Sequence, residues 1–249
     1  MPVRVSEALV LRTYPLQEAD LVVSFLTRNQ GKLRGVAKRA RRPKSAFGSG
    51  LQRLSHVRMA YFQRENRELV NLDSCELIRS QFGLVSDYRA GVALDYFAEV
   101  AEQLLPEGEP GDKFFRLLLA VLEDLRPPEV WRAVTYFSLW AVRLSGWLPE
   151  MHVCLGCGSV LEDSDRSYFV RGRPGLLCGH CRTTGAGSHW ELTVESRMIA
   201  SEMLRVPVSR LSKTEWAQAT ASDLRRFLVQ QMESQTDRRF LTPRLLEEA

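Results

Sequence analysis

Short apolar runs separated by turn signals fill the first 80 residues of the chain. Five such runs, rich in Val, Leu and Phe or similar side chains, cover residues 3–14, 21–28, 32–38, 57–63 and 69–78. Runs of this length and composition are typical of β-strands. Pro15, Gly31 and the polar segment 64–67 mark turns between them. Five strands with a longer link after the third predict a small β-barrel of the OB-fold type, although an SH3-like barrel would suit the same spacing.

The hydrophobic period changes to that of helices after residue 81. Apolar positions recur every three or four residues within 85–100, 114–125, 129–145, 193–204 and 214–234. The most apolar helix, 129–145, is shorter than a membrane span and contains Arg132 and Arg143, so it is interpreted as a buried helix. A loop-rich segment at 150–190 interrupts the helical pattern.

These patterns predict an α+β multidomain protein. Its parts are an OB-fold barrel at 1–80, a helical domain in two parts at 81–149 and 191–249, and a module inserted at 150–190. The first residues lack the layout of a secretory signal, so the five cysteines favour a reducing compartment over a disulfide framework.

Four of the five cysteines lie in the inserted module as two pairs. Cys154 and Cys157 form one C-x2-C pair, Cys178 and Cys181 form the other, and 20 residues separate the pairs. This spacing is typical of a four-thiolate Zn²⁺ site, and a hairpin across residues 167–177 would carry the second pair as in a zinc ribbon. Four thiolates leave no open coordination position, so the zinc is predicted to be structural. The alternatives are two unrelated pairs of buried thiols and a redox dithiol, for which one pair would suffice. The fifth cysteine, Cys75, is interpreted as a small buried residue.

The charge of the chain is unevenly distributed. Residues 1–80 contain 15 Lys and Arg against 7 Asp and Glu, a net charge of +8, whereas residues 81–249 carry −4. Seven cations fall within thirteen positions, and they are the predicted nucleic-acid-binding residues: Lys32, Arg34, Lys38, Arg39, Arg41, Arg42 and Lys44. Such density favours phosphate contact over a merely solvated loop. Tyr61 and Phe62 are candidates for base stacking, although they point to opposite faces and one is expected in the core.

No catalytic constellation is found in the sequence. A phosphate-binding glycine loop, a nucleophile elbow and an H-E-x-x-H motif are all missing, so the chain is predicted not to be an enzyme. The acidic residues Glu162, Asp163 and Asp165 are interpreted as a solvated loop. The pairs 225–226 and 238–239, all arginine, are interpreted as solvated helix faces, with an extended basic track as the alternative.

The order of these parts, and above all the segment 7–45 with its G-K-L-R-G-V-A-K-R-A-R-R run, resembles the RecO family of bacterial recombination mediators. The resemblance covers essentially the whole chain. It implies binding of single- and double-stranded DNA, annealing of complementary strands, and association with RecR. It also implies loading of recombinase onto DNA coated by single-stranded-DNA-binding protein, in the cytoplasm at the nucleoid. The alternatives are an RNA-binding accessory factor, an unrecognised nuclease, and a scaffold whose basic loop binds acidic protein.

Overall fold

The computed structural model describes residues 2–63, 68–182, 188–211 and 216–249. The chain forms two compact units, residues 1–118 with residue 249, and residues 119–248. The first two helices therefore belong to the same compact unit as the barrel. The four segments expected from the sequence, 1–80, 81–149, 150–190 and 191–249, stay a prediction.

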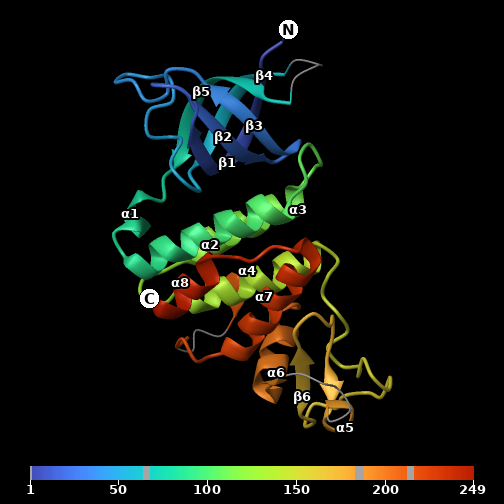
Figure 1. The fold of residues 1–249 in the computed structure, drawn as a ribbon. Helices are drawn as coiled ribbons and strands as arrows, with labels where there is room; N and C mark the ends of the chain where they lie inside the picture. Colours follow the sequence, from blue (N-terminus) through green and yellow to red (C-terminus); the bar gives the residue numbers. More distant parts are fainter. Residues whose placement is uncertain (1, 64–67, 183–187, 212–215) are drawn as a thin grey trace. The chain divides into compact units, whose positions relative to one another are not determined.

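A closed five-stranded barrel forms most of the first unit (Figure 1). Its strands are β1 (Arg4–Pro15), β2 (Leu21–Thr27), β3 (Gly31–Ala37), β4 (His56–Phe62) and β5 (Val70–Arg79). The order around the barrel is β1-β2-β3-β5-β4, and β1 closes it by pairing with β4. Only the β3–β5 pair among these is parallel. The predicted barrel is confirmed; the connection expected at 64–67 lies outside the described residues.

The barrel interior is filled by alternate side chains of all five strands. Val23 and Phe25 of β2 point inward with Leu33 of β3, and Tyr61 of β4 lies edge-on to Phe25 with ring centroids 5.9 Å apart. Phe47 joins this core from the long connection after β3. This connection is therefore held to the barrel by apolar packing as well as by its ends. Tyr61 is 1% exposed, which confirms that one of the two candidate stacking aromatics is core.

Two helices follow β5 within the first unit. They are α1 (Phe82–Val85) and α2 (Tyr88–Leu104), and α3 (Asp112–Asp124) begins in this unit and continues into the second. The carboxylate of Asp87 caps α2 by accepting a hydrogen bond from the Ala90 amide at 2.9 Å. One side of α2, rich in Ala, Val and aromatic residues, is buried.

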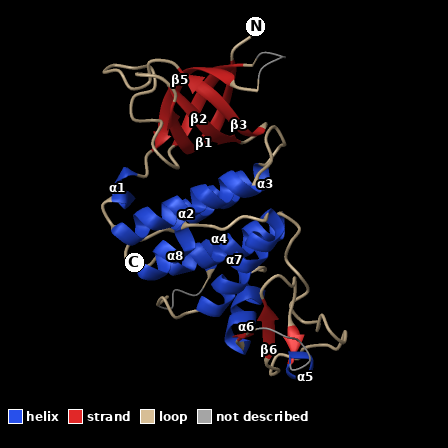
Figure 2. Ribbon diagram, viewed as in Figure 1, coloured by secondary structure: helices blue, strands red, loops and turns tan. Residues whose placement is uncertain are grey.

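The second unit combines helices with a small sheet (Figure 2). Its further helices are α4 (Trp131–Leu144), α5 (Gly179–Arg182), α6 (Val194–Met203), η1 (Val208–Arg210), α7 (Ser222–Thr236) and α8 (Thr242–Glu248). The antiparallel sheet has the order β7-β6-β8, formed by β7 (Leu177–Cys178), β6 (Ser167–Val170) and β8 (His189–Leu192).

The structure differs from the sequence prediction at several elements of this unit. Helix α7 begins at Ser222 and not near residue 214; part of the earlier stretch, 212–215, lies outside the described residues. The pattern did not predict α5, η1, β8 or α8. Helix α4 is buried over most of its surface, as expected. Among the described residues no helix is both long and apolar enough to cross a membrane.

Candidate metal centre and nucleic-acid interface

The four paired cysteines of the second unit converge on one point. The Sγ atoms of Cys154, Cys157, Cys178 and Cys181 all lie within 4.8 Å of one another. Those of Cys157 and Cys178 are 3.9 Å apart. A tetrahedral ion with metal–sulfur bonds of about 2.3 Å requires sulfurs roughly 3.8 Å apart, so this pair already has the separation of two ligands. The cluster could therefore hold a metal ion.

Two tight backbone turns place the sulfurs. The amide of Gly158, whose φ is +71°, donates to the Cys154 carbonyl at 2.9 Å and closes the first turn. The Cys178 amide donates to the Cys154 Sγ at 3.3 Å, which joins the two pairs, and the Cys181 amide donates to the Cys178 Sγ at 3.4 Å. A side chain at Gly156 would lie 3.0 Å from the Cys181 Sγ. Glycine at this position therefore lets the two pairs approach closely.

The pKa values of two cluster sulfurs shift in opposite directions. Hydrogen bonds from the Ser159 hydroxyl and amide lower the pKa of Cys157 to about 6. Hydrogen bonds with the sulfurs of Cys157 and Cys178 raise the pKa of Cys181 to about 12. Sulfurs this close cannot all be thiolates unless a cation lies between them. The donor set thus fits a cation that prefers thiolate ligands.

A buried arginine side chain holds the backbone of the acidic loop beside the cysteines. The guanidinium of Arg197 in α6 donates to four carbonyl groups of this loop, at 2.6 Å to Asp165, 2.8 Å to Glu162, 3.3 Å to Leu161 and 3.4 Å to Asp163. The Leu161 amide in turn donates to the His152 carbonyl at 2.8 Å, next to the first cysteine pair. Arg197 thereby anchors the cysteine module to α6.

The basic segment after β3 is an ordered part of the barrel unit. The Arg39 amide donates to the Asp20 carboxylate at 2.7 Å, and the Arg41 amide donates to the Ala19 carbonyl at 3.0 Å. Farther along, the Cys75 amide of β5 donates to the Ala46 carbonyl at 3.3 Å. We call the exposed side chains of this segment the basic platform: Lys38, Arg39, Arg41, Arg42 and Lys44. Within the described part of the chain, none of these five side chains forms an ion pair.

The other two predicted cations have partners inside the protein. Lys32 is 7% exposed, and its ammonium donates to the Glu102 carbonyl at 2.6 Å. Arg34 forms an ion pair with Glu107 at 2.7 Å. The chain from the end of α2 to the start of α3 therefore covers the part of the β3 face where these residues lie. Their role in phosphate binding stays a prediction that would require these contacts to open.

A β-bulge brings two further residues to the outer face beside the platform. The register of β1 and β2 shifts between Val10 and Arg12, so that Arg12 pairs with Ser24 and Tyr14 pairs with Val22. Ser24 and Val22 are in turn opposite Arg34 and Val36 on β3. Arg12 and Tyr14 therefore share the outer face with Arg34, and the Arg12 guanidinium lies 5.2 Å from the Tyr14 ring centroid. Neither residue was predicted from the sequence; the available signal was an arginine and a tyrosine two residues apart at the end of an apolar strand.

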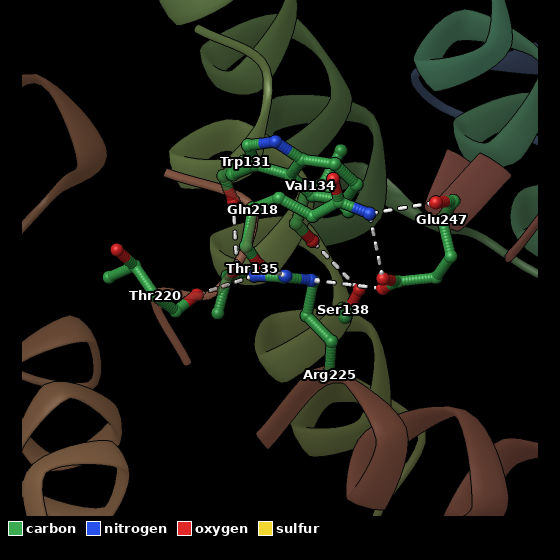
Figure 3. Close-up of polar contacts among 8 residues, drawn as sticks. All are labelled: Trp131, Val134, Thr135, Ser138, Gln218, Thr220, Arg225 and Glu247. Carbon is green, nitrogen blue, oxygen red and sulfur yellow. Dashed lines mark hydrogen bonds and ion pairs between the residues drawn. The ribbon is translucent and has the colours of Figure 1, made fainter. Parts of the chain in front are cut away.

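The arginine pairs of the second unit divide between interior and surface. Arg226, Arg238 and Arg239 are exposed, as expected, whereas Arg225 is 4% exposed and its interpretation as solvated was wrong. Arg225 donates to the Thr135 hydroxyl at 3.1 Å and to the Thr220 carbonyl at 2.7 Å, as well as to the Gln218 carbonyl (Figure 3). Its role is in the packing of α7 on α4.

Comparison with known proteins agrees with the arrangement of these parts. The family model for the N-terminal part of recombination protein O matches residues 1–81, and the model for its C-terminal part matches residues 85–243. The chain is 45% identical to the DNA repair protein RecO of Koribacter versatilis over 97% of both chains. It is 31% identical to that of Symbiobacterium thermophilum over 97% of this chain and 95% of the relative. The chain belongs to the RecO family of DNA repair proteins.

Proposed function

We propose that this protein binds single- and double-stranded DNA through the basic platform and anneals complementary strands without ATP. The observation that carries the proposal is the platform itself: five exposed cations without ion pairs among the described residues, on a segment pinned to the barrel. A pinned segment does not have to be ordered when a phosphate binds, so less conformational entropy is lost on binding.

Annealing would need only electrostatic screening by the protein and base pairing by the strands. Two strands repel because each is a line of phosphates, and cations placed between them lower this repulsion. Base pairing then supplies the free energy that brings the strands together. No nucleotide hydrolysis enters this sequence of steps, and the protein acts as a mediator and not as an enzyme.

The proposed partners follow from the family. We infer that the protein acts with RecR and helps to load recombinase onto single-stranded DNA coated by single-stranded-DNA-binding protein, in the cytoplasm at the nucleoid. Membership of a family of DNA repair proteins supports this cellular role.

We further propose that the four-cysteine cluster holds one structural Zn²⁺. Four cysteine sulfurs would fill a tetrahedral coordination sphere, so the ion would have no position for water or substrate. The ion would cross-link the two turns and would take no part in a reaction. The metal would thereby fix the module that Arg197 anchors to α6.

A salt series with matched variants tests the DNA-binding proposal. The variant Arg41→Ala/Arg42→Ala removes two platform charges; the control Lys113→Ala/Arg116→Ala removes two exposed charges of α3, which begins next to the opposite end of β3. For fluorescent single-stranded DNA, each lost phosphate contact should reduce the log–log salt slope by about 0.7. The platform variant should lose slope and affinity, and the control should not. Equal behaviour of the two variants would contradict the proposal, as would annealing that requires ATP.

A further inference from the structure

A groove in the first unit lies beside the outer face of β1. It has a volume of about 860 Å³ and is formed by β1, the segment before β4, α1 and the first half of α2. This size is within the range of sites that hold small organic groups. The buried apolar residues Val92 and Leu94 of α2 belong to its lining, together with Leu51. Part of the groove is therefore apolar.

Exposed aromatic rings occupy the helical side of this groove. Phe82 of α1 is 71% exposed and Tyr88 of α2 is 65% exposed, and Val85 between them is 59% exposed. Exposed aromatic rings grouped in this way are typical of interaction surfaces, because a partner that covers them removes apolar surface from water. Flat rings on a surface suit flat ligands, and nucleobases stack on such rings regardless of sequence.

Two arginines occupy the barrel side of the same groove. Arg12 lies on β1 and Arg53 on the segment before β4, where Arg53 forms an ion pair with Asp95 of α2. Burial, and then the nearby charge of Arg12, lower the pKa of Arg53. The lining thus contains two guanidinium groups against one carboxylate, which leaves a net positive charge beside the rings.

The groove is continuous with the basic platform across the barrel surface. Tyr14, Val22 and Val36 form a row of paired residues across β1, β2 and β3. Arg12 precedes Tyr14 by two residues on β1 and lies in the adjacent row of the same face. Lys38 then follows the end of β3, where the platform begins. Tyr14 is 37% exposed, and Val22 and Val36 are half-buried, so this row joins the two sites through accessible surface.

We propose that this groove receives unstacked bases of single-stranded DNA, with Phe82 and Tyr88 as stacking residues and Arg12 and Arg53 facing phosphates. The inference rests on the proposed function, because it extends the strand from the platform into the groove. The groove would then distinguish single strands, whose bases are free to enter, from duplexes, whose bases are already stacked.

A pair of ring substitutions tests the groove. Phe82→Ala/Tyr88→Ala should weaken binding to an oligothymidylate by about tenfold for each ring removed. The salt slope should stay that of the native chain, since no charge is lost, and binding to a duplex should be unchanged. Tyr88→Phe keeps the ring and should bind as the native chain does. Leu241→Ala, which removes a 73% exposed apolar side chain of the second unit, should also have no effect.

Photocrosslinking gives a second measurement that does not depend on affinity. A strand containing 5-iododeoxyuridine should attach to peptides that contain Phe82 or Tyr88. If the double variant binds single strands as the native chain does, while Arg41→Ala/Arg42→Ala weakens binding, the groove inference is overturned and the proposed function stands. A native chain that binds no DNA at low salt would overturn both.

Discussion

The guanidinium of Arg225 lies over the indole ring of Trp131, with its Cζ atom 4.4 Å from the ring centroid (Figure 3). The contact joins α7 to α4 in the interior of the second unit. Around the same guanidinium, Thr135, Thr220 and Gln218 accept hydrogen bonds, and Glu247 of α8 lies 3.8 Å away. Gln218 also donates to the Glu247 carbonyl at 2.7 Å, so the network reaches the C-terminal helix.

Replacing Arg225 should destabilise the second unit strongly. Arg225→Ala removes the ring contact and leaves buried carbonyl groups without a donor, which we expect to cost about 3 kcal/mol of unfolding free energy. The neighbouring Arg226 is exposed, and Arg226→Ala should change stability by less than about 0.5 kcal/mol. Denaturant unfolding of the two variants measures the difference. Similar stability of both would show that the buried network contributes little.

Loss of a single cluster cysteine should abolish binding of the proposed Zn²⁺. Cys157→Ser leaves three thiolates, so the purified variant should contain much less zinc than the native chain and should unfold at a lower temperature. Cys75 lies in the barrel core, and Cys75→Ala should keep full zinc content. Metal analysis of the purified proteins decides the point. Native protein that contains no zinc after growth with the metal would contradict the assignment.

The Cys75 thiol should make the barrel sensitive to alkaline pH. Burial raises the pKa of Cys75 to about 11, from an ordinary value of 9.0. Because the folded state holds this proton more tightly, the stabilisation is complete below pH 9 and is lost as pH rises towards 11. The loss is on the order of 2 kcal/mol. Between pH 8 and pH 10.5, the unfolding free energy should therefore decrease by more for the native chain than for Cys75→Ala. Parallel curves would show that Cys75 is not the group involved.

Gly31 should tolerate no side chain. Its φ is +71°, and a Cβ atom built there would lie 1.7 Å from the Glu109 carbonyl oxygen. Gly31→Ala combines an unfavourable backbone conformation with a clash against backbone, so we expect a loss of more than about 3 kcal/mol. Gly83 in α1 has open space around it, and Gly83→Ala should leave stability unchanged or slightly raised. Thermal unfolding of both variants checks this, and a stable Gly31→Ala would show that the 105–111 segment moves easily.

The sequence predicted what depends on local pattern. The five strands followed from apolar runs between turns, and the cysteine cluster followed from ligand spacing. The partners of Lys32 and Arg34 could not be predicted in this way, because Glu102 and Glu107 are about 70 residues away in the chain and no period links them. The bulge that turns Arg12 outward is likewise a property of strand register.

The buried position of Arg225 had a partial signal. Leu224, Phe227 and Leu228 surround it at helical spacing on the buried side of α7, whereas Arg226 points away from that side. Two adjacent arginines therefore have opposite environments, which a charge count over a segment cannot distinguish. The phase of each cation relative to the apolar stripe is the better guide.

Closure of the barrel determines how its binding surface can evolve. In a closed barrel each strand pairs with two neighbours, so the described strands offer little free edge on which an incoming chain could form a further strand. Recognition at the barrel must then depend on side chains and connecting loops. Affinity for a ligand can therefore be gained or lost by single substitutions on the outer face, one position at a time, while the hydrogen-bonded framework beneath stays the same.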